Sequence, residues 1–155
     1  MQTRQELYVR KITNGTVIDH ITPGYSLDVL KILGINGKDG EVVSVAMNVE
    51  SKQLQHKDIV KIQNRELKPS EVDKIALIAP NATINIVRNY DVSSKKVVEL
   101  PSSIRGIIKC DNPSCISNSR EPVEPRFGVD RREPIRLRCS FCGHVMERED
   151  VLKQF

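Results

Sequence analysis

The chain has 155 residues, no tryptophan and 4% aromatic residues, which predicts a core built from isoleucine, valine and leucine. Its 24 lysines and arginines against 20 aspartates and glutamates give a formal net charge of +4, too small by itself to indicate a nucleic-acid partner. No run approaches the roughly 18 apolar residues of a membrane helix and no secretion signal precedes the first motif, so we expect a cytoplasmic chain with reduced thiols and no membrane partner.

Residues 1–100 alternate between extended and helical patterns. Ser26 and Ser70 are the expected N-terminal caps of two helices, and Leu27, Leu30 and Leu33 would share one face of the first helix. In chain order we expect strands at Leu7–Ile12 and Thr16–Ile21, a helix from Ser26 to Gly34, strands at Glu41–Val49 and Asp58–Gln63, a helix from Pro69 to Pro80, and strands at Thr83–Val87 and Lys95–Leu100.

This order of elements predicts an α+β fold whose N-terminal domain is a ferredoxin-like split βαβ unit. In that arrangement both helices cover one face of an antiparallel sheet, and the other face and the edges stay open for a partner. Leu100–Ser103 has the composition of a hinge. We therefore expect one domain over residues 1–100 and a second, smaller one over residues 101–155.

The second domain is expected to be a small antiparallel module. Its predicted strands are Ile104–Cys110, Ile135–Cys139 and Val145–Glu147. The intervening spacer Ser117–Glu133 is rich in proline, arginine, serine and glutamate, and we expect it to lie outside the core.

All four cysteines of the chain lie in this second domain, as two close pairs: Cys110 with Cys115, and Cys139 with Cys142. Each pair offers two thiolates from one turn, and two facing turns form a tetrahedral sulfur site for one structural Zn²⁺ ion. Disulfides are disfavoured in a reducing compartment. A redox pair at Cys139 is disfavoured because the residues that follow predict a turn into a strand rather than a helix.

No catalytic motif accompanies the cysteines. The sequence contains no nucleophile elbow, no P-loop and no dinucleotide-binding glycine motif. His144 is a rival zinc ligand, but four thiolates already complete a structural site. Asp19 and His20 are an acid–base pair in principle, although nothing else completes an active site around them. We therefore expect a protein that is not an enzyme.

A scattered set of polar residues is the other feature of interest. In a split βαβ sheet these positions converge at one end, where lysines suit phosphates, a carboxylate suits ribose hydroxyls and strand carbonyls suit a base. Each residue taken alone is more typical of a solvated surface than of a binding site. The set comprises Asp19, His20, Lys57, Lys61, Asn85, Tyr90 and Lys95.

Several segments of the chain, in order, resemble the regulatory chain of aspartate carbamoyltransferase. The resemblance covers nearly the whole sequence and includes the cysteine spacing, whereas a generic zinc ribbon would share the cysteines alone. The pair Arg10-Lys11 departs from the acidic-plus-small pair of the best-known members. The matching segments are Gly15-Thr-Val-Ile-Asp-His-Ile21, Lys57-Asp-Ile-Val-Lys-Ile62, Ala79-Pro-Asn-Ala-Thr-Ile-Asn85, Asn89-Tyr90-Asp-Val92 and Cys110-x-Asn-x-x-Cys-Ile-Ser117.

The resemblance implies a non-catalytic subunit in pyrimidine biosynthesis. It implies that the N-terminal domain binds ATP, CTP and UTP and forms a dimer, and that the zinc domain docks on the catalytic chain, so that regulatory dimers bridge catalytic trimers. The nucleotide-binding residues carried over by the resemblance are Val9, Ile12, Val17, Asp19, His20, Lys57, Lys61, Asn85, Tyr90, Val92 and Lys95, and the metal ligands are Cys110, Cys115, Cys139 and Cys142.

One alternative belongs to a different class of protein. The arginines Arg126, Arg131, Arg132 and Arg136 lie near the metal site in sequence and suit either salt links to a partner subunit or a zinc-ribbon nucleic-acid-binding protein. Four thiolates around Zn²⁺ add a net charge of about −2, which offsets much of the excess of basic residues. This offset and the scarcity of aromatic residues favour the regulatory chain.

Overall fold

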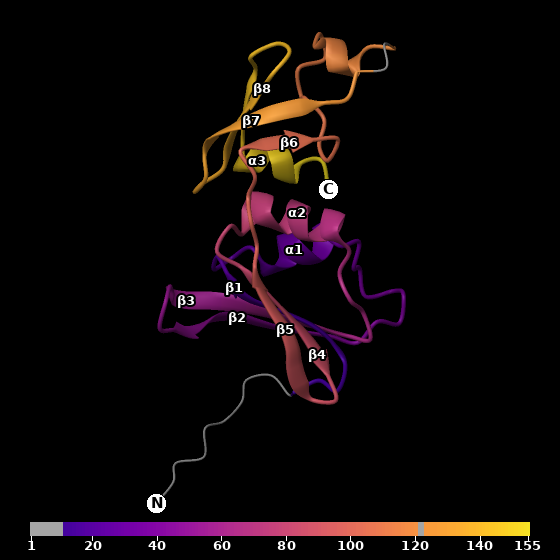
Figure 1. Cartoon of the computed structure of the whole chain (residues 1–155), viewed down its shortest axis with the longest axis vertical. Coiled ribbons are helices and arrows are strands. Elements are labelled where there is room, and N and C mark those ends of the chain that lie inside the picture. Colours follow the sequence, from indigo (N-terminus) through magenta and orange to yellow (C-terminus); the bar gives the residue numbers. More distant parts are fainter. Residues whose placement is uncertain (1–10, 121–122) are drawn as a thin grey trace, which may run out of the picture.

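Two antiparallel sheets, separated by a layer of helices, follow one another along the long axis of the molecule (Figure 1). The structure is a computed structural model that describes residues 11–120 and 123–155. The expected strand at Leu7–Ile12 therefore falls almost wholly outside the described residues, and Ile12 itself lies in no strand. No helix in the described ranges is long and apolar enough to cross a membrane.

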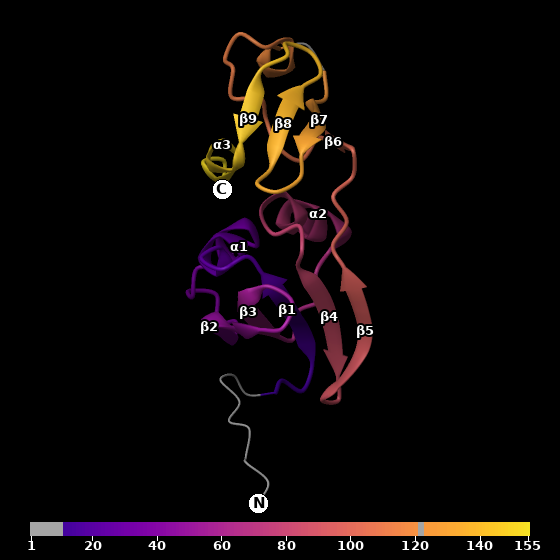
Figure 2. The same cartoon turned by 90° about the vertical axis from the view of Figure 1, so that its left-hand side faces the viewer.

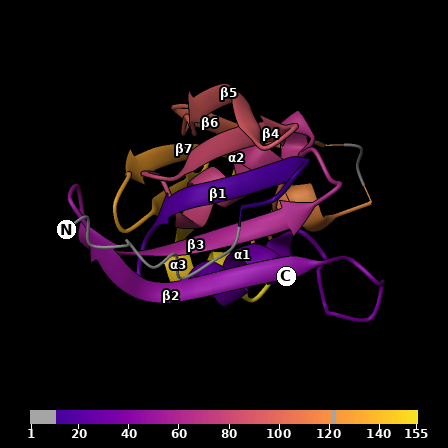
Figure 3. The same ribbon diagram turned by 90° about the horizontal axis from the view of Figure 1, so that it is seen from below.

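The first sheet has five strands in the order β2-β3-β1-β4-β5. Figure 3 shows these strands side by side with α1 and α2 behind them, which is the expected arrangement of an α+β, ferredoxin-like domain. Ile18, Val60, Ile62 and Ile84 are buried in this core. The elements are β1 (Gly15–Ile21), α1 (Ser26–Ile32), β2 (Val43–Ser51), β3 (Gln55–Gln63), α2 (Pro69–Ile78), β4 (Thr83–Arg88) and β5 (Asp91–Val97).

The first helix begins differently from the prediction. Tyr25 occupies the N-cap position, and Ser26 is a fully buried residue of the first turn, whose backbone N–H donates to Asp58 at 3.2 Å. Because this carboxylate takes over the capping, the serine hydroxyl is not needed for it. Leu27 is 59% exposed and does not belong to the buried face of the helix. Val29 contributes to that face instead.

The second helix is capped through a residue that the sequence pattern did not single out. Pro69 is the first helical residue, and the Glu71 carboxylate accepts a hydrogen bond from the backbone N–H of Lys68 at 3.0 Å. Ser70 is therefore not the cap. Proline is favoured at the first helical position because its φ is already helical and it lacks an N–H to satisfy.

The last strand of the first sheet starts earlier than predicted. β5 begins at Asp91 rather than Lys95, because Asn89 and Tyr90, with φ of 51° and 67°, close a tight turn from β4. Every residue of β5 is exposed. An edge strand with no buried side lacks the alternation of apolar and polar residues by which strands are recognised.

The second sheet has four strands in the order β6-β7-β8-β9. The prediction for the spacer is wrong in part: β7 lies inside it, and Phe127 of β7 is 1% exposed and pairs with Ile104 on one side and Cys139 on the other. The elements are β6 (Ser103–Arg105), the single 3₁₀ turn η1 (Ile116–Asn118), β7 (Arg126–Arg131), β8 (Arg136–Cys139), β9 (Val145–Glu147) and α3 (Arg148–Leu152).

Side chains as well as the connecting chain join the two parts of the molecule. Figure 2 shows α3 of the second part close to α1 and α2 of the first. The Arg148 guanidinium lies 4.4 Å from the centroid of the Tyr25 ring and pairs with Glu133. Arg132 donates a hydrogen bond to the Pro80 carbonyl at 2.9 Å. These contacts fix how the second sheet sits on the helices of the first.

Asp58 is a buried carboxylate that binds backbone groups from two separate segments of the first domain. It is 0% exposed and accepts hydrogen bonds from the backbone N–H groups of Gly24, Ser26 and Asn48 at 3.1, 3.2 and 2.8 Å. One side chain of β3 therefore ties the loop before α1 to the irregular middle of β2.

Replacing Asp58 by alanine should destabilise the first domain strongly. Three backbone N–H groups, among them that of the buried Ser26, would lose their acceptor, and the expected loss in the free energy of unfolding is about 3 kcal/mol. Urea unfolding followed by circular dichroism measures it. Asp39→Ala, in an exposed loop, is the matched control and should change little; equal stability of the two variants would contradict the role of Asp58.

Candidate functional site

The four cysteine sulfurs converge at one end of the second sheet. All four lie within 4.8 Å of one another, with Cys110 and Cys142 at 3.7 Å and Cys115 and Cys139 at 3.6 Å. A tetrahedron with zinc–sulfur bonds of about 2.3 Å has sulfur–sulfur edges of about 3.8 Å, whereas a disulfide needs about 2.05 Å. The cluster therefore fits a tetrathiolate metal site and does not fit two disulfides.

The backbone around the cluster is shaped to hold the sulfurs. Gly143, at a φ of 75°, donates a hydrogen bond to the Cys139 carbonyl at 3.0 Å, which closes the turn that carries the second cysteine pair. In the other pair, the Asn118 amide donates to the carbonyl of Cys110 at 2.7 Å. The left-handed φ at Gly143 is the reason a glycine suits this position.

The electrostatics of the cluster favour a cation at its centre. The backbone N–H of His144 lowers the pKa of the Cys142 thiol to about 6, whereas burial raises the pKa of Cys110 and of Cys139. Buried thiols ionise readily only when a positive charge compensates them, and a divalent cation supplies that charge. The His144 imidazole pairs with Asp111, so the four thiols form the ligand set without it.

A second candidate site is a cavity of about 490 Å³ at the first sheet. It brings together eight of the residues predicted from the sequence, from the four strands β1, β3, β4 and β5, the segment before β1 and the turn between β4 and β5. They are Ile12, Val17, Asp19, Lys61, Asn85, Tyr90, Val92 and Lys95.

The strand register explains why four of these residues meet. Val17 of β1 pairs with Lys61 of β3 on one side and with Asn85 of β4 on the other, and Asn85 pairs in turn with Lys95 of β5. Residues directly opposite one another in a sheet point to the same face. Their strand neighbours Ile18, Ile62 and Ile84 are buried in the core, so the four side chains form a row on the opposite face of the sheet. At the usual strand spacing the two lysines are about 14 Å apart along this row. Figure 3 shows the four strands side by side, with α1 and α2 behind them.

Two predicted residues lie beside the cavity rather than on its wall. Lys57 forms an ion pair with Asp19 at 2.9 Å and so positions the carboxylate that does line it. His20, at a φ of 56°, directs its Nδ1 to the Thr83 hydroxyl at 3.1 Å, and its backbone N–H donates to Asp19 at 2.7 Å. Val9 lies outside the described residues.

Sequence reasoning missed four wall residues, Lys11, Ile59, Val87 and Asp91. Ile59 shares its face with Lys61 by the two-residue period of a strand, so that pattern was sufficient to find it. Lys11 has an electrostatic effect: it adds to the burial that lowers the pKa of Lys61, which Asp19 partly opposes. The cavity wall therefore carries three lysines, Lys11, Lys61 and Lys95, and two carboxylates, Asp19 and Asp91.

A larger cavity, of about 950 Å³, lies between β5, α2 and Arg132. Of the predicted binding residues it contains Lys95 alone. Its charged residues are three cations and two carboxylates, the same balance as in the smaller cavity, so the predicted residues and not the charge distinguish the smaller cavity.

Comparisons with known proteins identify the two domains in which these candidate sites lie. A family model described as aspartate carbamoyltransferase regulatory chain, allosteric domain, matches residues 7–99, and one described as the metal binding domain of the same chain matches residues 102–152. Proteins named aspartate carbamoyltransferase regulatory chain are similar to this chain. Those of Methanocella arvoryzae (57% identity), Methanothermobacter thermautotrophicus (58%) and Saccharolobus solfataricus (50%) match over 96%, 97% and 97% of this chain and 96%, 96% and 95% of their own lengths.

The metal-binding model and the sulfur geometry together assign one structural zinc ion to Cys110, Cys115, Cys139 and Cys142. We expect Cys115→Ser to weaken zinc binding by about a hundredfold or more, because a buried thiolate is lost from a closed site. Metal analysis after dialysis against a graded chelator measures this. Ser140→Ala, within the second turn, is the control. Retention of one zinc per chain in both variants would contradict the assignment.

Proposed function

The chain belongs to the family of aspartate carbamoyltransferase regulatory chains, and we propose that it binds nucleoside triphosphates in the cavity of the first sheet and passes their effect to the catalytic chain. It is a non-catalytic subunit with an allosteric and a metal-binding domain, and its partner is the catalytic chain of an enzyme of pyrimidine biosynthesis. The nucleotides, the docking role of the zinc domain and self-pairing are the parts that we propose.

The row of Lys61, Val17, Asn85 and Lys95 is the observation that carries the nucleotide proposal. An ammonium group at an end of the cavity suits a triphosphate, and Asp19, held by Lys57, suits ribose hydroxyls. The apolar Val17 and the Tyr90 ring offer surface for a base. ATP, CTP and UTP each contain these three parts, so the cavity chemistry supports all three as ligands.

We propose that zinc supports docking by making the second domain rigid. The second sheet is short, and a module of about fifty residues buries too little apolar surface to fold firmly by itself. A tetrathiolate site connects the loop at Cys110–Cys115 to the end of β8 and the turn after it. The resulting rigid surface is what we propose the catalytic chain recognises, in the cytoplasm of the cell.

Self-pairing is proposed for the first sheet. Its outer strands in the described part of the chain are β2 and β5, and both expose large apolar side chains. Met47 of β2 and Val42, directly before β2, are each 55% exposed. Open strand edges of this kind favour pairing with a second copy. Such a dimer would present two zinc domains and so bridge two catalytic trimers.

Coupling between the sites is proposed to run through the domain interface. Asp19 in the cavity pairs with Lys57, and the next residue, Asp58, holds the backbone on both sides of Tyr25. Tyr25 in turn contacts Arg148 of the zinc domain. The coupling that allosteric control requires is modest, about 1–3 kcal/mol, and one such interface is sufficient to supply it.

Isothermal titration of the zinc-loaded chain with CTP and with ATP tests the nucleotide proposal. Lys61→Ala and Lys95→Ala should each weaken binding about tenfold or more, because each removes a charge-assisted contact to phosphate or ribose. Lys96→Ala is the matched control, since Lys96 follows Lys95 on the same strand but faces the other side of the sheet. Undiminished binding in both test variants would exclude this cavity as the site.

Tyr25→Leu tests the coupling separately. The leucine keeps an apolar contact but removes the ring that faces Arg148, so nucleotide affinity should stay within about twofold while the effect of nucleotide on catalytic activity falls severalfold. Activity of the reconstituted complex with and without nucleotide measures this. Leu27→Ser, on the exposed side of the same helix, should leave the response intact. An unchanged response in Tyr25→Leu would place the coupling elsewhere.

A further inference from the structure

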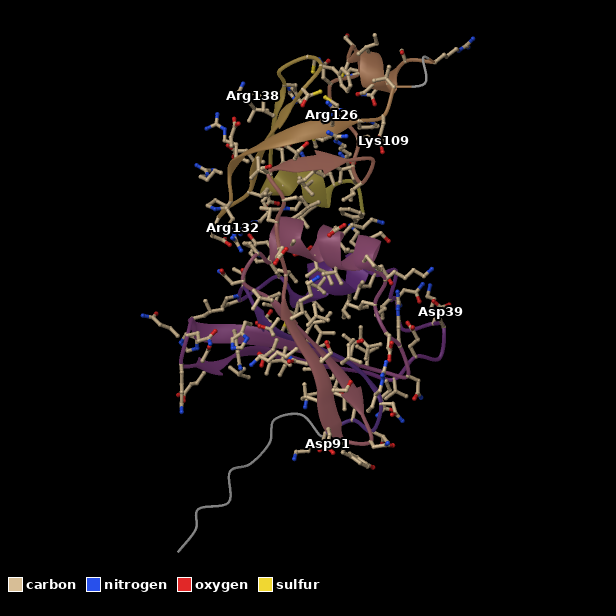
Figure 4. The ribbon with its side chains drawn as sticks, in the orientation of Figure 1. Asp39, Asp91, Lys109, Arg126, Arg132 and Arg138 are labelled. Carbon is tan, nitrogen blue, oxygen red and sulfur yellow. The ribbon has the colours of Figure 1, made fainter. Side chains whose placement is uncertain are left out.

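The outward face of the second sheet carries a group of arginines. Along β7 and β8, Phe127, Leu137 and Cys139 are buried, so the residues that alternate with them point outward. Those outward positions, with their neighbours on β6, include Arg105, Arg126 and Arg138, all exposed. Figure 4 shows Arg126 and Arg138 on this sheet, beyond the helices of the first domain.

Two of these arginines face each other directly. Arg105 of β6 is the register partner of Arg126 of β7, so their Cβ atoms are about 5 Å apart. Like charges at directly opposed positions destabilise a sheet. Within the described part of the chain neither arginine forms an ion pair, whereas Arg138 pairs with Asp130 at 3.0 Å. The carboxylate of Glu124 lies instead against Gly106.

The space beside this pair is empty of side chains. Gly128 lies in the next outward row, between Ser103 and Arg138, and no atom other than its own neighbours lies within 4 Å of where its Cβ would be. The missing side chain of Gly128 therefore leaves an open position in the outward row, next to Arg105, Arg126 and Arg138. We call these four residues the arginine depression.

We propose that the arginine depression is the point at which the zinc domain receives a carboxylate of an acidic segment on the catalytic chain. This rests on the proposed docking function and names the chemistry of the surface. A carboxylate placed between Arg105 and Arg126 relieves their repulsion, and guanidinium groups pair with carboxylates through two parallel hydrogen bonds. The carboxylate of the bound partner offsets the repulsion between the two arginines. This explains why the chain keeps a pair that destabilises the sheet when no partner is bound.

Protein carboxylates fit this depression better than a nucleic acid does. The outward row continues from Arg138 to Arg136, the register partner of Arg131, but the group stays short and Arg138 is already paired with Asp130. A phosphate backbone is bound by longer tracks of positive charge, and single strands are bound by exposed aromatic rings. The outward face of this sheet in the described residues offers no aromatic side chain, since Phe127 is buried.

Arg105→Ser and Arg126→Ser test the proposal with two independent readouts. Removing either charge relieves the repulsion, so the melting temperature of the isolated zinc-loaded chain should rise or stay the same. Assembly with the catalytic chain should weaken about tenfold, and the loss should shrink as salt is raised from 50 to 500 mM. Lys153→Ser, which removes an exposed charge of the same domain outside the sheet, is the control for net charge.

Gly128 offers a second, constructive test. Gly128→Glu places a carboxylate inside the depression, where it pairs with the arginines from within the chain. This variant should be more stable than Gly128→Gln, which has the same size without the charge, and it should assemble less well than Gly128→Gln. Equal stability and equal assembly of the two variants would show that the depression does not receive a carboxylate.

The outcomes separate this inference from the function on which it rests. If the two arginine variants assemble as tightly as the wild-type chain, the depression is not a docking point, while docking of the zinc domain stands. If the wild-type chain fails to assemble with the catalytic chain, both fail. Salt-sensitive binding of a 20-nucleotide single-stranded RNA that is lost in Arg105→Ser would show that the arginine depression binds phosphate groups and would overturn the proposal of a protein carboxylate.

Discussion

The convergence of four sulfurs on one point is the constraint on which the zinc domain depends. Three of the four cysteines are buried, and burial raises the pKa of the Cys110 and Cys139 thiols, which disfavours their ionisation without a cation nearby. One Zn²⁺ ion reverses this, because it ionises the thiols and binds segments that are distant in sequence into one unit. The core around Phe127 and Leu137 then closes against that unit, so the domain owes its shape to the metal as much as to apolar burial.

The first domain follows from the two-residue period of its strands. One set of positions, which includes Ile18 and Val60, packs under the helices, and the alternate set is left on an open face. Because register aligns Lys61, Val17, Asn85 and Lys95 across four strands, residues far apart in sequence become one binding surface without any loop excursion. A flat open face lined by lysines is stable in water when empty and gains most when an anion covers it.

The sequence was sufficient to predict the features that rest on local periods and on cysteine spacing. These include the order of helices and strands in the first domain and the clustered cysteines, whereas Ile12, Val17 and Val92 of the cavity wall were expected from the family resemblance. The sequence was insufficient where contacts between residues distant in the chain determine the local structure. The cap of α1 is Asp58, distant in sequence, so Ser26 was misassigned, and β7 was missed because the prolines and arginines around it hide one buried phenylalanine. The turned-away imidazole of His20 depends on Thr83, a contact that no local pattern contains.

The two sites lie on opposite sides of the helical layer, so any influence of one on the other has to cross it (Figures 1 and 2). If the second domain were flexible, a small shift of Tyr25 would cause only local rearrangement within it. A domain held rigid by zinc would instead move as a whole when Arg148 is displaced. The Arg148 side chain is only 12% exposed and is held between Tyr25 and Glu133, so its position is defined on both sides of the interface. In the coupling that we propose, rigidity at the metal would let the contact between Tyr25 and Arg148 act on the zinc domain as a whole, and so on its docking surface.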